Sequence, residues 1–228
     1  MARTGWQPWR PGRAPTLPGL GRVVGHRGTA AHAPENTLAS IEKAHALGCR
    51  WVELDAKLAR DEIPFLLHDA TLDRTTSGKG PAAAMDFDDI RRLDAGSWFG
   101  PDFAGVHPPS LADTLEHLLK LGMGANIEIK PCPGREALTG RTVANTVVRL
   151  WPADATPLLL SSFSEEALAA AREAAPDLPL GLLVERLPKD WAERMQRLDC
   201  TTLHLSHEHI TLSAMDDLVE QNVPLLFY

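Results

Sequence analysis

The sequence predicts an α/β protein with the architecture of a (β/α) barrel, and two observations lead to this prediction. Short apolar runs alternate with helical patterns from end to end, as in parallel sheets covered by helices. No GxGxxG sequence follows a predicted strand, so the signature of a dinucleotide-binding doubly wound sheet is missing. Composition alone leaves the choice between these two folds open. The 228 residues, 44% of them hydrophobic, can form one good core, so we expect one domain or two small ones.

The first 20 residues predict an irregular arm rather than a secretory signal. They are rich in Pro, Gly, Arg and Trp and contain no apolar stretch of the kind that signal peptides carry. Trp6 or Trp9 is expected to pin this arm, and the barrel domain is expected to occupy residues 21–228.

The residues after the arm predict a strand, a helix and a hairpin. A strand is expected at 22–25, and a helix over 36–48 is expected to begin at the cap Asn36. The strand WVELD at 51–55 continues, turns back on itself and ends near residue 69.

The segment from about 71 to 108 is expected to be an insertion after the second barrel strand. Gly, Asp and Pro break its pattern, and one short helix is expected near 86–93. A helix over 114–122 with a Gly stop and a strand over 125–130 then resume the alternation.

The second half repeats strand and helix in turn. Ser164 and Ser213 are expected to cap helices over 164–175 and 213–221. Seven barrel strands are expected in all, marked by Val23, Trp51, Ile127, Leu159, Leu182, Leu203 and Leu225. A TIM barrel has eight strands, one more than this count.

The charge balance and the cysteines limit the classes of function. With 23 basic and 30 acidic residues the formal net charge is −7, which provides no basic face for nucleic acid. No apolar run approaches the ~20 residues needed to cross a bilayer, so no stable membrane insertion is expected. Cys49, Cys132 and Cys200 are odd in number and far apart, which argues against a disulfide framework. We therefore expect a soluble, cytoplasmic protein.

Three acidic residues on two predicted strands form a candidate metal site. Glu53 and Asp55 share one face of their strand, and Glu128 is expected to join them from the next barrel strand. Clustered carboxylates repel one another unless a cation or a proton intervenes, and an all-oxygen set suits Mg²⁺ or Ca²⁺ better than zinc. The alternative is that these acids pair with Arg or Lys at the surface, the usual position of Asp and Glu.

Two histidines are candidate acid and base groups. His26 and His68 each follow an apolar run, so both are expected at the carboxyl-terminal rim of the barrel. Histidine exchanges protons near neutral pH, although a single histidine is more often structural than catalytic. Arg27 and Lys130 would supply positive charge for a phosphate, Arg as a bidentate fork and Lys as a point charge.

Other polar and aromatic residues allow two interpretations each. A zinc site is conceivable in the histidine-rich segment 203–210, but its spacing fits no standard site, and a solvated or structural role is favoured. Asp69 is expected either to orient His68 or to cap the next turn. Phe163 is expected either to line the mouth of a pocket or to pack as a core aromatic.

Five short motifs occur in order at these strand ends. They are HRG (26–28), PENT (34–37), ELD (53–55), HD (68–69) and EIK (128–130). Together with LDRTTSGKG, LDAGSWFGPDFAG and PPSLADTL in and after the insertion, they closely resemble the glycerophosphodiester phosphodiesterase family. The resemblance runs from about Leu20 to the C-terminus.

The resemblance implies a TIM barrel of the phospholipase C-like phosphodiesterase type. It also implies hydrolysis of glycerophosphodiesters to sn-glycerol 3-phosphate and an alcohol, with one divalent cation, Mg²⁺ or Ca²⁺. The motifs imply acid/base roles for His26 and His68, phosphate contacts for Arg27 and Lys130, metal ligation by Glu53, Asp55 and Glu128, and a place near or on the metal for Glu35.

The family continues beyond the point at which this sequence ends, with a helix, a closing strand and a last helix. A missing eighth strand would leave two open sheet edges, which favour association between copies or lower stability. Besides the leading interpretation, two alternatives remain open. One is a lysophospholipase D-like phosphodiesterase with an apolar mouth, and the other is a truncated, catalytically impaired remnant that binds phosphodiesters.

Overall fold

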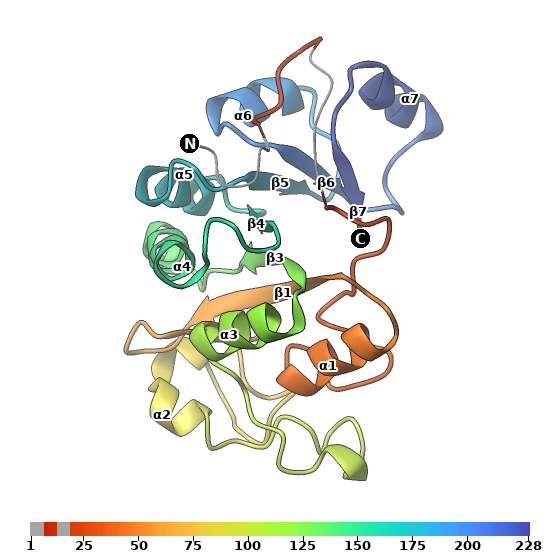
Figure 1. The fold of residues 1–228 in the computed structure, drawn as a ribbon. Helices are drawn as coiled ribbons and strands as arrows, with labels where there is room; N and C mark the ends of the chain where they lie inside the picture. The colour runs from red at the N-terminus through yellow and green to blue at the C-terminus, as the bar shows by residue number, and fades with distance from the viewer. Residues whose placement is uncertain (1–6, 13–18) are drawn as a thin grey trace.

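The computed structural model describes residues 7–12 and 19–228, and strands and helices alternate along most of them (Figure 1). The elements are α1 (Leu38–Ala46), β1 (Trp51–Leu58), β2 (Pro64–Leu66), α2 (Phe87–Ile90), α3 (Leu111–Leu121), β3 (Gly124–Ile129), α4 (Glu136–Leu150), β4 (Leu158–Ser162), α5 (Glu165–Ala174), β5 (Leu180–Val184), α6 (Trp191–Arg197), β6 (Thr202–Leu205), α7 (Leu212–Glu220) and β7 (Leu225–Phe227). Two short 3₁₀ helices, Ala82–Ala84 and Pro101–Phe103, lie in the segment between β2 and α3.

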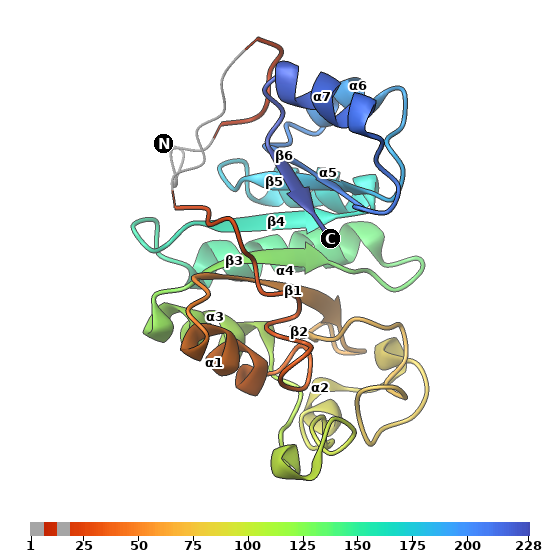
Figure 2. The same ribbon diagram turned by 90° about the vertical axis from the view of Figure 1, so that its right-hand side faces the viewer.

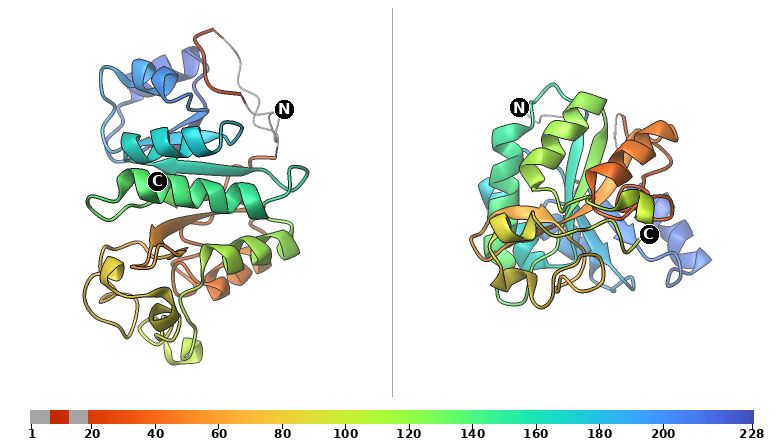
Figure 3. Two further views of the ribbon diagram at one scale, coloured as in Figure 1. Left: turned by 90° about the vertical axis from the view of Figure 1, so that its left-hand side faces the viewer. Right: turned by 90° about the horizontal axis from the view of Figure 1, so that it is seen from below.

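One seven-stranded sheet organises the molecule, in the order β2-β1-β3-β4-β5-β6-β7. The β1–β2 pair is antiparallel, and every other pair is parallel. Helices α3, α4 and α5 cover the outer face of the sheet, and the segment that precedes α1 crosses its other side (Figures 2 and 3). Within residues 7–12 and 19–228 the sheet does not close, which confirms the predicted incomplete barrel.

The strand expected at 22–25 is reduced to a single bridge between Gly25 and Val52. The backbone N–H of Gly25 donates to Trp51 O, and Glu53 N–H donates to Gly25 O. Arg27 and Gly28 then adopt positive φ angles of 49° and 84°, which turn the chain away from the sheet before a ladder can form. The seventh strand of the sheet is instead β2, the returning arm of the predicted hairpin.

Two of the expected helix caps are wrong, and two expected helix ends are confirmed. Thr37, rather than Asn36, caps α1 by accepting a hydrogen bond from the Ser40 N–H. The cap of α7 is Thr211 rather than Ser213. Ser164 caps α5 as predicted, and Gly122 ends α3 in the left-handed conformation.

Two helices were not predicted, α4 and α6. The α4 sequence contains Gly140 and several threonines and valines, all of which have low helix propensity. Helix α6 has only 7 residues, which is too short for a clear apolar period. Both helices form because they pack against the outer face of the sheet or its neighbouring helices.

The two faces of the sheet have opposite polarity. Outward-facing side chains of β1 and β3 are apolar and join the main core beneath the helices: Val52, Leu54, Ala56, Ala125, Ile127 and Ile129. Residues between them in sequence, including Glu53, Asp55 and Glu128, point to the other side because side chains alternate along a strand. Their arrangement concentrates the polar groups inside the curved sheet.

The described part of the arm is anchored by Trp9, one of the two tryptophans expected to pin it. Trp9 is buried, its backbone N–H donates to Cys200 O at 2.8 Å, and its ring centroid lies 5.0 Å from that of Trp191. Trp6 lies outside the described residues.

The segment between β2 and α3 packs on the hairpin through its own apolar cluster, whose buried members are Ala59, Phe65, Leu67, Leu72, Ala82, Phe87 and Ile90.

Of the helices in the described chain, none is long and apolar enough to cross a membrane.

Candidate active site

The register of β1 and β3 brings the three predicted acidic residues together. Asp55 is directly paired with Glu128, and Glu53 lies one inward position before Asp55. Among the described residues, these three form a group whose potential ligand oxygens all lie within 4.8 Å of one another. Asp55 and Glu128 are buried, so the surface ion-pair alternative does not hold for them.

Crowding changes the protonation of this acidic cluster. Burial raises the pKa of Glu53 well above its usual value, and the charges of Asp55 and Glu128 raise it further. Burial and the charge of Asp55 likewise raise the pKa of Glu128. Three carboxylates this close are expected to bind a cation, because a bound cation removes the repulsion that otherwise favours their protonated forms.

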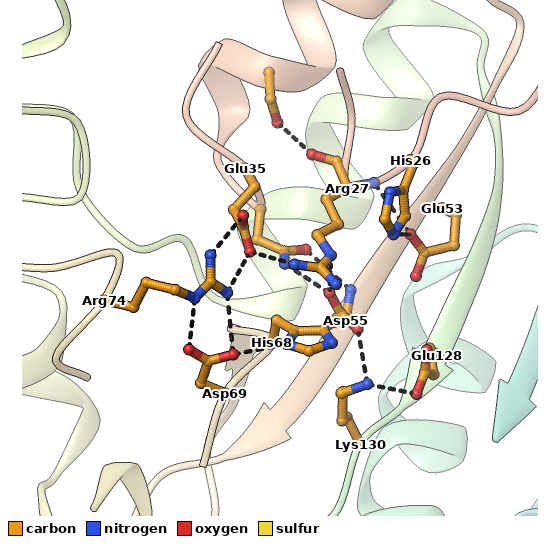
Figure 4. Close-up of polar contacts among 12 residues, drawn as sticks. His26, Arg27, Glu35, Glu53, Asp55, His68, Asp69, Arg74, Glu128 and Lys130 are labelled. Carbon is orange, nitrogen blue, oxygen red and sulfur yellow. Dashed lines mark hydrogen bonds and ion pairs between the residues drawn. The ribbon is translucent and has the colours of Figure 1, made fainter. Parts of the chain in front are cut away.

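The HRG loop lies directly over the cluster (Figure 4). The Arg27 backbone N–H donates to Glu53 Oε2 at 3.1 Å, and the Arg27 guanidinium donates to Glu35 Oε1 at 2.8 Å. His26 Nε2 lies 3.9 Å from Glu53 Oε2. Burial and the neighbouring Arg27 charge lower the pKa of His26, which favours a neutral imidazole near neutral pH.

Glycine is required at the turn of the HRG loop. A Cβ atom on Gly28 would lie 2.2 Å from Ser40 Oγ, and the φ angle there is 84°. Ser40 Oγ donates to Arg27 O at 3.0 Å, so a side chain of α1 holds the loop by a hydrogen bond.

Asn36 contributes to the site although the sequence predicted it as a helix cap. Its side-chain NH₂ donates to Asp55 Oδ2 at 2.8 Å, and its carbonyl oxygen accepts from the Asp55 N–H at 3.0 Å. This pair of bonds fixes the Asp55 carboxylate. The only signal in the sequence for this role is the presence of Asn36 in the PENT motif.

His68 follows β2 and is held by Asp69. His68 Nδ1 and Asp69 Oδ1 are 2.7 Å apart, which supports the orienting role predicted for Asp69. Burial lowers the pKa of His68, and the hydrogen bond with Asp69 opposes this shift. His26 and His68 line the same cavity, as the sequence predicted for the rim of the barrel.

Arg74 is a charged residue beside the site that the sequence analysis does not single out. Its guanidinium contacts both Asp69 and Glu35 (Figure 4). Partial burial would raise the pKa of Glu35, but hydrogen bonds from Arg74 and Arg27 outweigh this effect and the pKa lies below its usual value. The signal in the sequence is the presence of Arg74 in the LDRTTSGKG motif.

Lys130 lies beside the acidic cluster, and a second lysine supports it. Lys130 Nζ donates to Glu128 Oε1 at 3.0 Å and lies 3.7 Å from Asp55 Oδ1. The buried Lys57 donates to the backbone carbonyl of Lys130 at 2.9 Å. Lys57 was not singled out in the sequence, although it lies on the inward face two residues after Asp55.

The acidic cluster, both histidines, Arg27 and Lys130 border one cavity of about 790 Å³. His26, Arg27, Glu53, Asp55, His68, Glu128 and Lys130 line its polar side. Its other side is mostly apolar and contains Leu20, Val23, Val24, Phe163, Leu183, Leu225, Leu226, Phe227 and Tyr228. Phe163 therefore lies at the cavity, 5.8 Å from Tyr228 between ring centroids, with Lys130 Nζ 5.8 Å from its ring.

The histidines of segment 203–210 do not converge with Cys200 into a metal site within the described chain. His204 is buried at the cavity wall, where burial lowers its pKa to about 3 and Thr202 is its hydrogen-bond partner. His207 Nδ1 instead contacts Tyr228 O at 2.6 Å. Cys49, Cys132 and Cys200 are free thiols.

Comparison with known proteins gives one consistent family. The sequence matches the model of the glycerophosphoryl diester phosphodiesterase family over residues 26–228. It is 31% identical over 208 residues to the glycerophosphodiester phosphodiesterase of Caldanaerobacter subterraneus subsp. tengcongensis, covering 89% of this chain and 83% of that protein. It is 32% identical over 176 residues to a Bacillus subtilis glycerophosphodiester phosphodiesterase, covering 72% of this chain and 59% of that protein.

A solved structure shares both fold and sequence with this chain. It is an Oleispira antarctica phosphodiesterase in complex with the product sn-glycerol-3-phosphate. The TM-score is 0.88 at 37% identity, and the match covers 92% of this chain and 84% of that one.

Proposed function

The chain belongs to the glycerophosphoryl diester phosphodiesterase family, and from this premise we propose that it hydrolyses glycerophosphodiesters to sn-glycerol 3-phosphate and an alcohol. The observation that carries the proposal is the convergence of three carboxylates, two histidines and two cationic side chains on one cavity. The product bound to the similar Oleispira antarctica phosphodiesterase supports the same substrate class.

The acidic cluster fits one divalent cation, Mg²⁺ or Ca²⁺. Glu53, Asp55 and Glu128 supply only oxygen ligands, the type that both ions prefer. When bound, such a cation would stabilise negative charge that develops on the phosphate. Glu35 remains a candidate ligand, and its present contacts are the guanidinium groups of Arg27 and Arg74.

The remaining groups divide the chemistry of phosphodiester cleavage between them. Arg27 and Lys130 bind the phosphate, Arg27 by its fork and Lys130 as a point charge. Of His26 and His68, one takes the proton of a glycerol hydroxyl that attacks the phosphorus, and the other protonates the departing alkoxide. The cyclic phosphate that forms is then opened by water to give glycerol 3-phosphate. The lowered pKa values of both histidines suit proton acceptance, and Asp69 beside His68 favours the protonated form of that ring.

The direct test is release of glycerol 3-phosphate from glycerophosphocholine by the purified chain. We expect release with Mg²⁺ or Ca²⁺, abolition by EDTA and recovery when excess metal is added back. Release that EDTA leaves unchanged would contradict the metal assignment. No release with either metal would favour the alternative of a catalytically impaired protein that binds phosphodiesters. Binding of glycerol 3-phosphate to the purified chain then tests that alternative.

A second candidate function is suggested by the apolar side of the cavity. Leu183, Leu225 and Phe163 offer a surface for an acyl chain, as a lysophospholipase D-like phosphodiesterase requires. Comparison of kcat/KM for lysophosphatidylcholine and glycerophosphocholine separates the two. A higher value for the lysolipid would assign the acyl-bearing substrate to this site.

The proposal also covers the binding partner and the cellular compartment of the protein. A small glycerophosphodiester is the partner, and the three free thiols fit the cytoplasmic location that the composition predicts.

A further inference from the structure

Arg74 joins two carboxylates that belong to different parts of the site. Its Nε and Nη2 donate to Asp69 Oδ2 and Oδ1 at 2.7 and 3.0 Å. Its Nη1 and Nη2 donate to Glu35 Oε2 and Oε1, both at 2.9 Å. One guanidinium thus makes a bidentate pair with each carboxylate, an arrangement that only an arginine fork can provide.

Each carboxylate held by Arg74 in turn holds a residue of the proposed chemistry. Asp69 Oδ1 is 2.7 Å from His68 Nδ1. Glu35 Oε1 accepts from Arg27 Nη1 at 2.8 Å, and Arg27 Nε lies 3.5 Å from Asp55 Oδ2. A continuous chain of polar contacts therefore runs from His68 through Arg74 to Arg27 and the acidic cluster (Figure 4).

These polar contacts join two segments of the protein that pack in separate apolar clusters. Arg74 lies after Leu72, which is buried in the apolar cluster on the β1–β2 hairpin. Glu35 lies in the loop before α1, whose residues Ile41 and Ala44 pack into the main core. Without the guanidinium, Asp69 and Glu35 would face each other as two like charges, which favours separation of the loops.

We propose that Arg74 is a positioning residue that holds His68, through Asp69, and Arg27, through Glu35, in a fixed relation across the cavity. This role rests on the proposed phosphodiesterase function. Arg74 is not among the residues that line the cavity. Its contribution is geometric, since a displacement of about 1 Å in a catalytic group can cost about 100-fold in rate.

The test compares Arg74→Ala and Arg74→Lys with a matched control, Arg60→Ala. Arg60 makes a comparable two-bond pair with Asp86, at 2.8 and 2.5 Å, and it is exposed and does not line the cavity. The readouts are kcat and KM for glycerophosphocholine, and hydrogen–deuterium exchange of residues 28–36 and 70–76.

We expect kcat of Arg74→Ala to fall about 10- to 100-fold, with Arg60→Ala within about twofold of the wild type. Arg74→Lys is expected to recover little, because an ammonium cannot make two bidentate pairs. Millimolar guanidinium is expected to restore part of the Arg74→Ala rate, whereas equal concentrations of sodium chloride should not. Both loop segments are expected to exchange faster in Arg74→Ala than in Arg60→Ala.

A kcat of Arg74→Ala within twofold of an active wild type would overturn the proposal, as would an equal loss in Arg60→Ala. An inactive wild type would instead refute the proposed function. In that case hydrogen exchange decides the role of Arg74: unchanged exchange at residues 28–36 in Arg74→Ala would refute the connection, and faster exchange would support it.

Discussion

The backbone at Arg27 has a φ angle of 49°, a left-handed conformation that non-glycine residues rarely adopt. Three contacts hold it there, from Arg27 N–H to Glu53, from its guanidinium to Glu35 and from Ser40 Oγ to its carbonyl. Backbone strain of this kind persists where the surroundings determine it, and it is found most often at functional sites. Here it directs the Arg27 guanidinium across the acidic cluster.

At this scale the first prediction concerns the two histidines. His26→Ala and His68→Ala are each expected to lower kcat about 100- to 10,000-fold, the usual contribution of an acid or base group. Divalent-cation binding, measured by calorimetry, is expected to survive because neither histidine belongs to the acidic cluster. The exposed His32→Ala serves as control. A near-normal rate in either variant would refute the acid/base assignment.

The second prediction concerns pH and the raised pKa of Glu53. In the unfolded chain Glu53 ionises near its usual value, whereas burial, Asp55 and Glu128 delay ionisation in the folded protein. The contribution of Glu53 to the free energy of unfolding is therefore fully present below the pKa that Glu53 has in the unfolded chain. This contribution is lost as pH rises through the pKa that Glu53 has in the folded protein. In EDTA, Glu53→Gln is expected to escape this loss and to melt about 2–4 °C above the wild type at pH 8, equivalent to about 1 kcal/mol at this size.

The difference in melting temperature between Glu53→Gln and the wild type should disappear near pH 4. Added Mg²⁺ or Ca²⁺ should raise the melting temperature of the wild type but not that of Glu53→Gln. The control Glu208→Gln changes an exposed carboxylate outside the cluster. Equal melting temperatures for Glu53→Gln and the wild type across this pH range would contradict the explanation.

Among the elements, α4 and α5 approach each other unusually closely. Gly140 allows this contact, because a Cβ atom there would lie 2.1 Å from the Ala167 carbonyl oxygen on α5. The glycine that weakens the helical pattern of α4 in the sequence is thus required by the packing of the folded protein. Helix propensity and packing make opposite demands at this position.

The third prediction follows from this conflict. Propensity alone predicts that Gly140→Ala stabilises the protein by about 1 kcal/mol. We expect destabilisation by about 1–3 kcal/mol instead, because the added methyl group overpacks the contact with backbone atoms. Urea denaturation measures the difference, with the neighbouring exposed Arg141→Ala as control. A more stable Gly140→Ala variant would show that α5 can move away.

Elements with strong local signals were predicted, and those that depend on packing were not. Gly122 and Ser164 mark helix ends by their own chemistry. The segment 22–25 has the composition of a strand, but the turn at Arg27 and Gly28 leaves it a single bridge. That outcome depends on contacts with Glu53 and Ser40, which are distant from the segment in sequence.

At the scale of the whole molecule, β7 is an edge strand of the described sheet and borders the cavity of the candidate site. β7 pairs with β6 on one side, and Phe227 and Tyr228 at its end are 46% and 42% exposed. Val23, which borders the same cavity, is 67% exposed. Unpaired edges with exposed apolar side chains favour pairing between chains.

The fourth prediction is that the chain of residues 1–228 associates through this edge. We expect sedimentation velocity to show a concentration-dependent oligomer, and Phe227→Lys to shift it toward monomer, because charged residues at an edge oppose strand pairing. The control Leu212→Lys places the same charge on the exposed start of α7. Monomers at all concentrations for the wild type would contradict this prediction.

By itself the sequence determined the incomplete α/β barrel and the family, together with the carboxylates, histidines and cations proposed for the chemistry. These features follow from the period of strands and helices and from short motifs at strand ends, both of which are local in the chain. Only the tertiary structure decided that Asn36 holds Asp55 and that Arg74 connects Asp69 with Glu35. Such contacts join residues whose meeting depends on the register of strands and the course of loops, and no local pattern encodes that geometry.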